Sequence, residues 1–194
     1  KIKHSKYLKN TQIITDQVIS IKSKEVITSS KKIPFDFLVL ASGSSYHFPI
    51  KEENVMVAER GDHLTKKAHQ LKQSNNILVI GGGLVGVELA TEIRDHYPNK
   101  NITLVQSRNC CLPRLNLSAQ KFTQSYLEKN KINLILNEKI NQKKDQYWIT
   151  SKNRKIPADL TFFCTGITPN SNYLQNNQSI HLDQKGFIKV NQYL

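Results

Sequence analysis

Cysteine is scarce in this sequence, with three residues among 194. Cys110, Cys111 and Cys164 form no C-x-x-C or C-x-x-C-H pattern, and none of the six histidines stands at metal-ligand spacing from them. We therefore expect neither a bound metal nor a redox-active dithiol. Cys110 and Cys111 are neighbours in an expected loop, where two free thiols are favoured over a vicinal disulfide. Cys164 is expected in a buried strand.

Long apolar runs are also absent, because no stretch approaches the roughly 18–20 apolar residues that cross a bilayer. No signal-peptide pattern of basic, apolar and small residues follows the first residue. That residue is Lys1 and not methionine, so we expect the chain to be an internal piece of a longer protein. The apolar fraction of 38% and the single tryptophan are typical of a soluble globular protein.

Acidic residues are outnumbered, with 15 Asp and Glu against 28 Lys and Arg, which gives a formal net charge of +13. A charge of this size suits contact with nucleic acid or with an anionic membrane surface. However, the lysines are spread along the whole chain, in pairs such as Lys31–Lys32, and form no dense block. We favour a lysine-rich solvated surface and keep an anion-attracting face, for DNA or a membrane surface, as the alternative.

Hydrophobic periodicity predicts the order of the elements. Short β-prone runs occupy residues 11–45, and the last of them, 35–41, predicts a strand that ends in a small-residue turn. From about residue 75 the pattern alternates strand, helix, strand, helix and strand, and it ends with two short β-runs near 139–150 and a last strand over "ADLTFFCTG". Helices are expected at 61–73, from the glycine turn to Pro98, and at 118–130, with Ser118 as N-cap and with Phe122 and Tyr126 as an i,i+4 pair.

This alternation predicts an α/β fold with a parallel sheet from about residue 75 to residue 170. The segments on either side look like β-rich pieces of another domain. The pattern therefore indicates a complete nucleotide domain inserted in an incomplete second domain.

The glycine turn at 81–86 carries the clearest chemistry. It satisfies G-x-G-x-x-G, follows an apolar strand, opens an amphipathic helix and precedes a second strand. Gly81 permits the tight turn, Gly83 leaves room for a pyrophosphate at the helix N-terminus, and Gly86 lets helix and strand pack closely. A purely structural turn is the alternative. We predict that the turn binds a dinucleotide through Gly81, Gly82, Gly83, Leu84, Val85 and Gly86.

The end of the second strand bears on the choice of nicotinamide nucleotide. An acidic residue there bonds the ribose of NAD, whereas a nearby arginine accommodates the 2′-phosphate of NADP. This chain has Gln106, Ser107 and Arg108. Gln106 can form hydrogen bonds without repelling a phosphate, and Arg108 can pair with one, so both NADH and NADPH stay open.

Glu88 lies two residues past the last glycine of the turn, where we expect the first turn of the helix. The helix dipole favours a carboxylate in that turn, which by itself explains the residue. Alternatively, Glu88 lies at the nicotinamide end of the site, where it orients the ring or relays a proton. The residues alone leave both interpretations open.

Four stretches, "PFDFLVLASGS", "ILVIGGGLVGVELATEI", "NITLVQS" and "FFCTGITPN", resemble in order and spacing the FAD-dependent pyridine nucleotide-disulfide oxidoreductase superfamily. The run "GVELATEIRDHYPNKNITLVQS" is especially similar to its apoptosis-inducing-factor-like, mitochondrion-associated branch. The resemblance covers residues 11–194. It implies a Rossmann-like NAD(P)-binding domain at 73–170, inserted in a partial FAD-binding domain made of 1–72 and 171–194.

The resemblance also implies roles for single residues. Glu88 matches the carboxylate beside the nicotinamide and the flavin ring. Val18 matches a position whose backbone contacts the adenine of FAD. Two loops match the family's flavin-approaching loops: Ala41, Ser42 and Gly43, where Ser42 replaces the usual threonine, and Thr165 and Gly166, with Pro169 and Asn170.

The function that the resemblance implies is oxidation of NADH or NADPH by hydride transfer to FAD, with electrons passed on to a quinone-like acceptor. The family's N-terminal FAD fingerprint and its C-terminal flavin-holding segment are missing here, so we expect the chain to bind NAD(P)H without retaining FAD. The alternatives are an interaction protein that binds DNA through a basic surface, and a nucleotide-binding fragment without turnover. We expect a cytoplasmic protein, with a membrane-associated or mitochondrial location of the longer protein left open.

Overall fold

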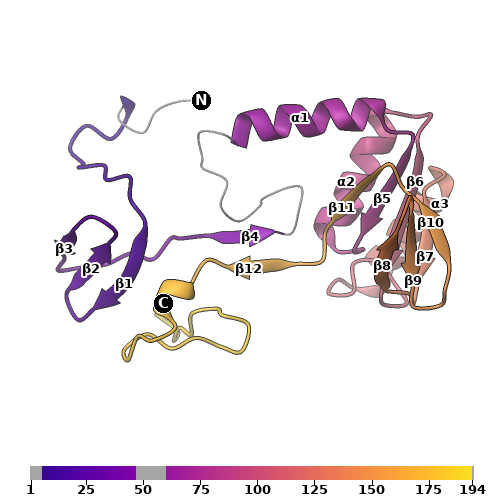
Figure 1. The fold of residues 1–194 in the computed structure, drawn as a ribbon. Helices are drawn as coiled ribbons and strands as arrows, with labels where there is room; N and C mark the ends of the chain where they lie inside the picture. Colours follow the sequence, from indigo (N-terminus) through magenta and orange to yellow (C-terminus); the bar gives the residue numbers. More distant parts are fainter. Residues whose placement is uncertain (1–5, 47–59, 194) are drawn as a thin grey trace. The chain divides into compact units, whose positions relative to one another are not determined.

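The computed structural model describes residues 6–46 and 60–193, and the chain divides into two compact units (Figure 1). The first, called here the flanking unit, takes in residues 1–44 and 168–194. The second, the central unit, takes in residues 45–167. The central unit therefore interrupts the flanking unit in the sequence.

The central unit is built on a parallel sheet of four strands in the order β11-β5-β6-β7. The strands are β5 (Asn76–Ile80), β6 (Asn101–Gln106), β7 (Asn133–Leu136) and β11 (Leu160–Phe163). Helix α2 (Leu84–His96) connects β5 to β6, and helix α3 (Leu117–Lys129) lies between β6 and β7. The predicted α/β fold with a parallel Rossmann-like sheet is confirmed.

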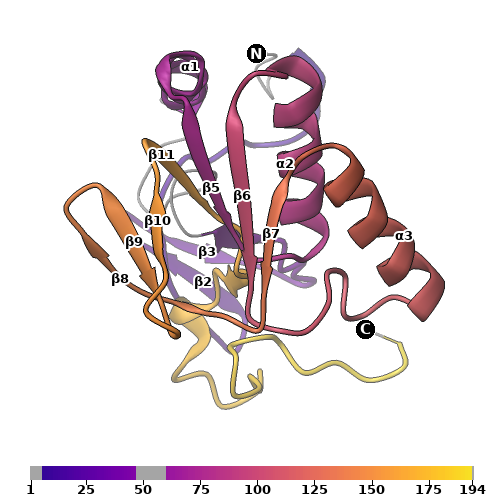
Figure 2. The same ribbon diagram turned by 90° about the vertical axis from the view of Figure 1, so that its right-hand side faces the viewer.

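Alternating residues of the central strands face two separate cores. Ile77 and Val79 of β5 pack toward α2 and α3, together with Ile93. Leu78 and Ile80 pack on the opposite face, against the antiparallel sheet of β8 (Ile140–Lys144), β9 (Tyr147–Thr150) and β10 (Lys155–Pro157). Figure 2 shows the two helices on one side of the parallel sheet and the antiparallel strands on the other. Burial on both faces explains why "NILVI" is apolar throughout.

The start of α3 differs from the prediction. Asn116, not Ser118, is the N-cap, and its side-chain oxygen accepts a hydrogen bond from the Ala119 amide at 2.9 Å. Ser118 is already inside the first turn, because the helix begins at Leu117. An asparagine at the N-cap reaches the N3 amide as well as a serine does, so Asn116 caps the helix where it begins. The predicted Phe122–Tyr126 pair is confirmed, with ring centroids 6.2 Å apart.

Helix α1 (Arg60–Gln73) agrees with the predicted helix at 61–73. Two contacts attach its last turn to the rest of the central unit. The Lys100 ammonium donates to the Lys72 carbonyl at 3.1 Å, and Leu71 packs against the core that contains Ile77 and Val79. The central unit accordingly takes in α1, and its limits of 45 and 167 differ from the limits of 73 and 170 that we expect for the nucleotide domain.

The flanking unit contains an antiparallel sheet of β1 (Val18–Lys22), β2 (Glu25–Thr28) and β3 (Lys32–Pro34). A short 3-10 helix, η2 (Asn172–Leu174), follows in the second segment of this unit. The Asn177 side chain donates to the Ile21 carbonyl at 2.8 Å, which ties the C-terminal segment to β1. The remaining strands, β4 (Ser44–Tyr46) and β12 (Ile167–Pro169), pair with each other.

The strand predicted over 35–41 is wrong for the described structure. These residues belong to no strand, and no described strand pairs with them. Phe37 and Val39, which should alternate into a core, are 95% and 87% exposed. A strand requires a neighbour for its backbone hydrogen bonds, and the described part of the flanking unit supplies none at this segment.

A buried acid joins the antiparallel sheet to the end of the parallel sheet. The Glu138 side chain is 3% exposed, and the Arg154 guanidinium donates two hydrogen bonds to its Oε1, at 3.3 and 3.2 Å. The Thr150 hydroxyl and the Arg154 guanidinium hold the pKa of Glu138 below its usual range. The Glu138 amide donates to the Gln106 carbonyl at 3.3 Å, so this acid also lies next to the end of β6.

Replacing the acid by Glu138→Gln is expected to lower the free energy of unfolding by about 1–2 kcal/mol at neutral pH, because Arg154 loses a charged acceptor. The contribution of Glu138 is complete above the pKa of an unfolded glutamate, about 4.3, and disappears as the pH falls through the lower pKa of the folded protein. The difference between wild type and variant should therefore shrink on acidification. Denaturant unfolding followed by the fluorescence of Trp148, the single tryptophan, measures it.

The control is Glu92→Gln, which removes a glutamate whose side chain is 63% exposed. That change should alter the free energy of unfolding by less than about 0.5 kcal/mol. Equal effects of the two substitutions, or a Glu138 effect that grows on acidification, would contradict the structural role given to Glu138.

Candidate functional site

Three of the predicted loops meet at one edge of the parallel sheet. The glycine turn follows β5, Gln106 ends β6, and Thr165 lies just beyond β11. Parallel strands present their carboxyl ends at the same edge, which is where ligands bind in open α/β sheets. Backbone bonds join two of the loops, because the Gly81 amide donates to the Val105 carbonyl at 2.8 Å and the Leu112 amide donates to the Gly82 carbonyl at 2.8 Å.

Two glycines of the turn are required by the protein's own packing. Gly81 has φ +110°, and a Cβ there would lie 2.5 Å from the Cys164 carbonyl oxygen. A Cβ on Gly86 would lie 1.8 Å from the Gly81 carbonyl oxygen. No side chain can occupy either position without moving backbone. The roles predicted for them, a tight turn and close helix packing, agree with this geometry.

Gly83 is different, because nothing in the structure needs it to lack a side chain. Its φ of −79° suits any residue, and a Cβ there would meet no atom within 4 Å. Gly83 is also the N-cap of α2 and makes no side-chain capping bond. The first amides of any α-helix have no partner within the helix, and at the start of α2 the position that a Cβ of Gly83 would take is open. This is the arrangement that accommodates a phosphate group at a helix N-terminus.

Gly82, the remaining glycine of the turn, contacts a residue whose role the sequence analysis missed. A Cβ on Gly82 would lie 2.8 Å from the Cys111 sulfur. Cys111 is fully buried. Burial and, to a smaller extent, the neighbouring Cys110 thiol raise the pKa of Cys111 to about 11. Cys111 therefore packs against the turn as a neutral thiol. All three cysteines are free.

The Gln106 side chain is 7% exposed, and both ends of its amide are used within its own loop. Its nitrogen donates to the Cys110 carbonyl at 3.3 Å, and its oxygen accepts from the Ser107 amide at 3.0 Å. Ser107 and Arg108 are both exposed. Of the three residues predicted to lie at the ribose, Ser107 and Arg108 face solvent, whereas the Gln106 side chain is hydrogen-bonded within its own loop.

Glu88 is exposed on α2, but it does not lie in the first helical turn as the sequence analysis expected. The helix begins at Leu84, so Glu88 is its fifth residue, and the first turn contains no acid. The expected boundary was wrong because the glycine turn continues directly into the helix. Stabilisation by the helix dipole falls off beyond the first turn, so the dipole explains Glu88 less well than expected.

The loop after β11 also lies at this edge. Thr165 and Gly166 are exposed, and Gly166 has φ +123° with no atom within 4 Å of a built Cβ. Cys164 is buried as expected, but it follows the strand instead of belonging to it, since β11 ends at Phe163. Burial raises the pKa of the Cys164 thiol to about 11.

The predicted residues of the flanking unit form a separate group. Ser42 and Gly43 are exposed. The Asn170 side chain donates to the Ser42 carbonyl at 3.0 Å, and the Asn170 backbone amide donates to the Gly43 carbonyl at 3.0 Å. The Tyr173 hydroxyl donates to the Ser42 hydroxyl at 3.2 Å, a contact across 131 positions that no local pattern predicts. Ala41 is exposed beside them, whereas Val18 is half-buried at the start of β1.

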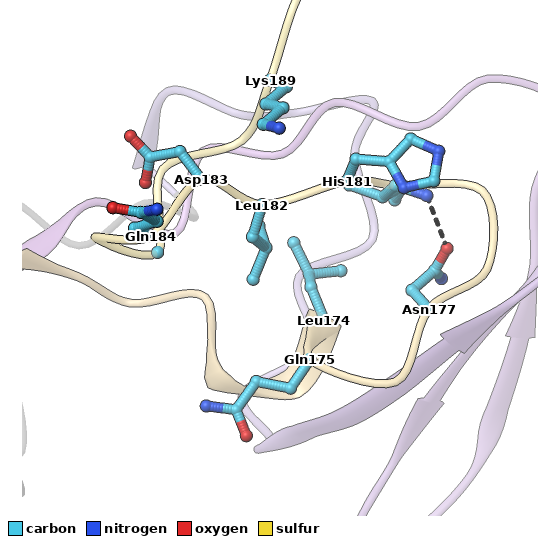
Figure 3. Close-up of a pocket in the computed structure, with 10 residues that line it drawn as sticks. Leu174, Gln175, Asn177, His181, Leu182, Asp183, Gln184 and Lys189 are labelled. Atoms are coloured by element: carbon cyan, nitrogen blue, oxygen red, sulfur yellow. Dashed lines mark hydrogen bonds between the residues drawn. The ribbon is translucent and has the colours of Figure 1, made fainter.

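One cavity is lined by none of these residues. It measures about 500 Å³, belongs to the flanking unit, and is drawn in Figure 3. Leu174 and Leu182 point toward each other inside it, and the Asn177 side chain accepts from the Ile180 amide at 2.9 Å beside them (Figure 3). A second cavity, of about 380 Å³, lies beside Trp148 in the central unit. Neither contains the glycine turn, so we assign the candidate site from chemistry and not from cavity size.

Within the described residues, no three His, Cys, Asp or Glu side chains gather closely enough to hold a metal ion. Among the described helices, none has both the length and the apolar character that crossing a bilayer requires.

Curated relatives match most of the chain. The chain is 31% identical over 218 residues to apoptosis-inducing factor homolog A of Dictyostelium discoideum, a match that covers 98% of the chain and 53% of that protein. It is 29% identical over 188 residues to human ferroptosis suppressor protein 1, which covers 91% and 50% respectively. The chain thus spans about half the length of the curated relatives it matches.

Among solved structures, an engineered NADPH oxidase derived from the Lactobacillus brevis enzyme, bound to NADPH, superposes with a TM-score of 0.74 at 22% identity. That match covers 91% of this chain and 42% of the other, and it establishes the likeness of fold. The pyridine nucleotide-disulphide oxidoreductase family matches residues 3–194. With the glycine turn, the parallel sheet and these relatives in agreement, the chain belongs to the pyridine nucleotide-disulphide oxidoreductase family.

Proposed function

We propose that this chain is the NAD(P)H-binding part of an FAD-dependent oxidoreductase, which oxidises NADH or NADPH and passes the electrons to a quinone-like acceptor. The observation that carries the proposal is the open space at Gly83. The protein's own packing explains Gly81 and Gly86, but it leaves the absence of a side chain at Gly83 unexplained. A pyrophosphate on the first amides of α2 supplies the missing reason.

In this proposal the nucleotide lies along the carboxyl edge of the parallel sheet. Its pyrophosphate accepts hydrogen bonds from the amides that begin α2. The adenosine ribose lies toward Ser107 and Arg108, both of which are exposed. Glu88, exposed on the second turn of α2, faces the nicotinamide end and orients the ring. Thr165 and Gly166 border the same edge.

The flanking unit is proposed as part of the FAD-binding domain. Gly43 has φ +70° and belongs to an exposed loop that Asn170 and Tyr173 hold from the second segment of the unit. Such a loop brings backbone close to a ligand without a side chain in the way. FAD held there would supply the hydride-accepting and electron-donating chemistry, and the protein would position the two cofactors and exclude competing reactions.

The quinone-like acceptor rests on the resemblance of the sequence to the apoptosis-inducing-factor-like branch. Because the chain spans about half of the curated relatives it matches, the activity is proposed for the full-length protein. The domain limits of 73–170 for the NAD(P) domain, and of 1–72 and 171–194 for the FAD domain, belong to the same proposal.

The nucleotide site can be tested with two glycine substitutions that differ in what the packing allows. Gly83→Ala is expected to weaken NAD(P)H binding by about tenfold or more, because the methyl group occupies the space for the pyrophosphate. It should cost less than about 1 kcal/mol of stability, the usual difference between glycine and alanine at an N-cap. Titration calorimetry and thermal melting measure the two effects.

Gly86→Ala is the matched control. Its methyl group collides with the Gly81 carbonyl oxygen, so it should lower the melting temperature strongly before any ligand is added. Unchanged nucleotide affinity in a well-folded Gly83→Ala protein would remove the pyrophosphate from this turn.

Hydride transfer can be tested in the full-length protein loaded with FAD. Anaerobic addition of NADH or NADPH should bleach the flavin absorbance. Glu88→Gln should slow the bleaching by about tenfold or more, because the nicotinamide is held less well against the flavin, while nucleotide affinity stays within about twofold. Glu92→Gln, one turn further along α2 and also exposed, should leave both quantities unchanged.

Failure of both nucleotides to bleach the flavin would refute the oxidoreductase function. Equal effects of the two glutamate substitutions would instead leave the function standing and remove the role of Glu88.

A further inference from the structure

The end of β6 decides which ribose a Rossmann-like site accepts. Sites for NAD place a carboxylate there, which accepts hydrogen bonds from the ribose hydroxyls, and sites for NADP place an arginine there for the 2′-phosphate. In this protein the side chain at that point is Gln106. Its oxygen accepts from the Ser107 amide and its nitrogen donates to the Cys110 carbonyl, so the amide is committed inside the loop. Its oxygen keeps a second lone pair, but the side chain is only 7% exposed, so little of it is open to a ribose hydroxyl.

The loop after β6 contains no carboxylate that could accept a hydrogen bond from the ribose hydroxyls. Residues 107–116, which connect β6 to α3, contain no aspartate or glutamate. The acid bonded to this point through its backbone is Glu138, whose amide donates to the Gln106 carbonyl. Its Oε1 is paired with Arg154, which offsets the negative charge, and its Oε2 has no hydrogen-bond partner among the described residues but is buried, so neither oxygen is exposed to a ligand.

The loop instead exposes hydrogen-bond donors. The Ser107 hydroxyl and the Arg108 guanidinium are exposed directly after β6. The Arg108 side chain makes no hydrogen bond or ion pair within the described residues, while its backbone is fixed, since the Arg108 carbonyl accepts from the Asn137 amide at 3.0 Å. A fixed backbone with an uncommitted guanidinium suits a phosphate, which carries about −1.5 to −2 charges at neutral pH and takes bidentate bonds from arginine.

We infer that the site selects NADPH over NADH and that Arg108 is the residue that recognises the 2′-phosphate. This inference rests on the proposed nucleotide function and adds the choice of cofactor to it. The selectivity arises from two features together: Gln106 is withdrawn into the loop, and Glu138 is neutralised by Arg154. The sequence alone shows the glutamine and the arginine, but not that the glutamine's amide is already committed.

The experiment measures the affinities of NADP⁺ and NAD⁺ for the full-length protein by titration calorimetry. The wild type should bind NADP⁺ at least about tenfold more tightly than NAD⁺. Arg108→Gln should bring the two affinities within about threefold of each other by weakening NADP⁺ alone. The preference of the wild type should also decline as salt is raised, because it depends on an exposed charge.

Lys129→Gln is the charge-matched control. It removes one exposed positive charge from the last turn of α3 and should leave both affinities unchanged. Arg108→Gln should melt at the wild-type temperature, since its side chain makes no bond within the described structure.

The affinities of the two nucleotides separate the selectivity from the nucleotide function. Equal affinities of the wild type for the two nucleotides, or equal weakening of both by Arg108→Gln, would overturn the selectivity and leave the nucleotide function intact. Binding of neither nucleotide by the wild type would overturn the proposed function together with this inference.

Discussion

The contact between Gly86 and the Gly81 carbonyl is the constraint on which the rest of the site depends. A Cβ at Gly86 would stand 1.8 Å from that oxygen, so the first turn of α2 lies directly on the glycine turn. This contact fixes the direction of the helix relative to β5 and therefore the direction of its first amides. Cys111 packs against the same turn at Gly82, and the Cys164 carbonyl approaches it at Gly81. Backbone from three loops thus meets where side chains are absent, and Gly83 is left as the open position.

The electrostatics of the site follow from burial and not from composition. The net charge of +13 says little about any one location, because the lysines are scattered along the chain. At the end of β6, however, a carboxylate is buried against Arg154 and an amide is turned inward, while Arg108 stays exposed. The Glu138 carboxylate is cut off from water, and the Arg154 guanidinium, whose side chain is 58% exposed, supplies the compensating charge. Because the Glu138 carboxylate and the Gln106 amide are both buried, the exposed groups at the end of β6 are mainly hydrogen-bond donors.

The elements of the central unit could be predicted from the sequence because their signals are local. "NILVI" reads as a strand covered on both faces, and Pro98 marks the end of α2, which stops at His96. The failures have equally physical reasons. The segment 35–41 has the composition of a strand but lacks a pairing neighbour among the described residues. Ser118 was predicted as the N-cap, but the backbone enters the helix two residues earlier, at Asn116. The contact of Tyr173 with Ser42 spans too many positions for any periodicity to reveal.

By itself, the sequence determined the parallel α/β fold, the glycine turn and the family resemblance, because each depends on residue type at short spacing. Backbone conformation and close packing are encoded in those local patterns. Only the tertiary structure decided which glycines serve the packing and which one leaves a space. It also decided that Gln106 is committed within its loop, that Glu138 is neutralised, and that Glu88 lies beyond the first helical turn. Those properties depend on which atoms distant in sequence come within a few ångströms of each other, and only the folded chain brings them there.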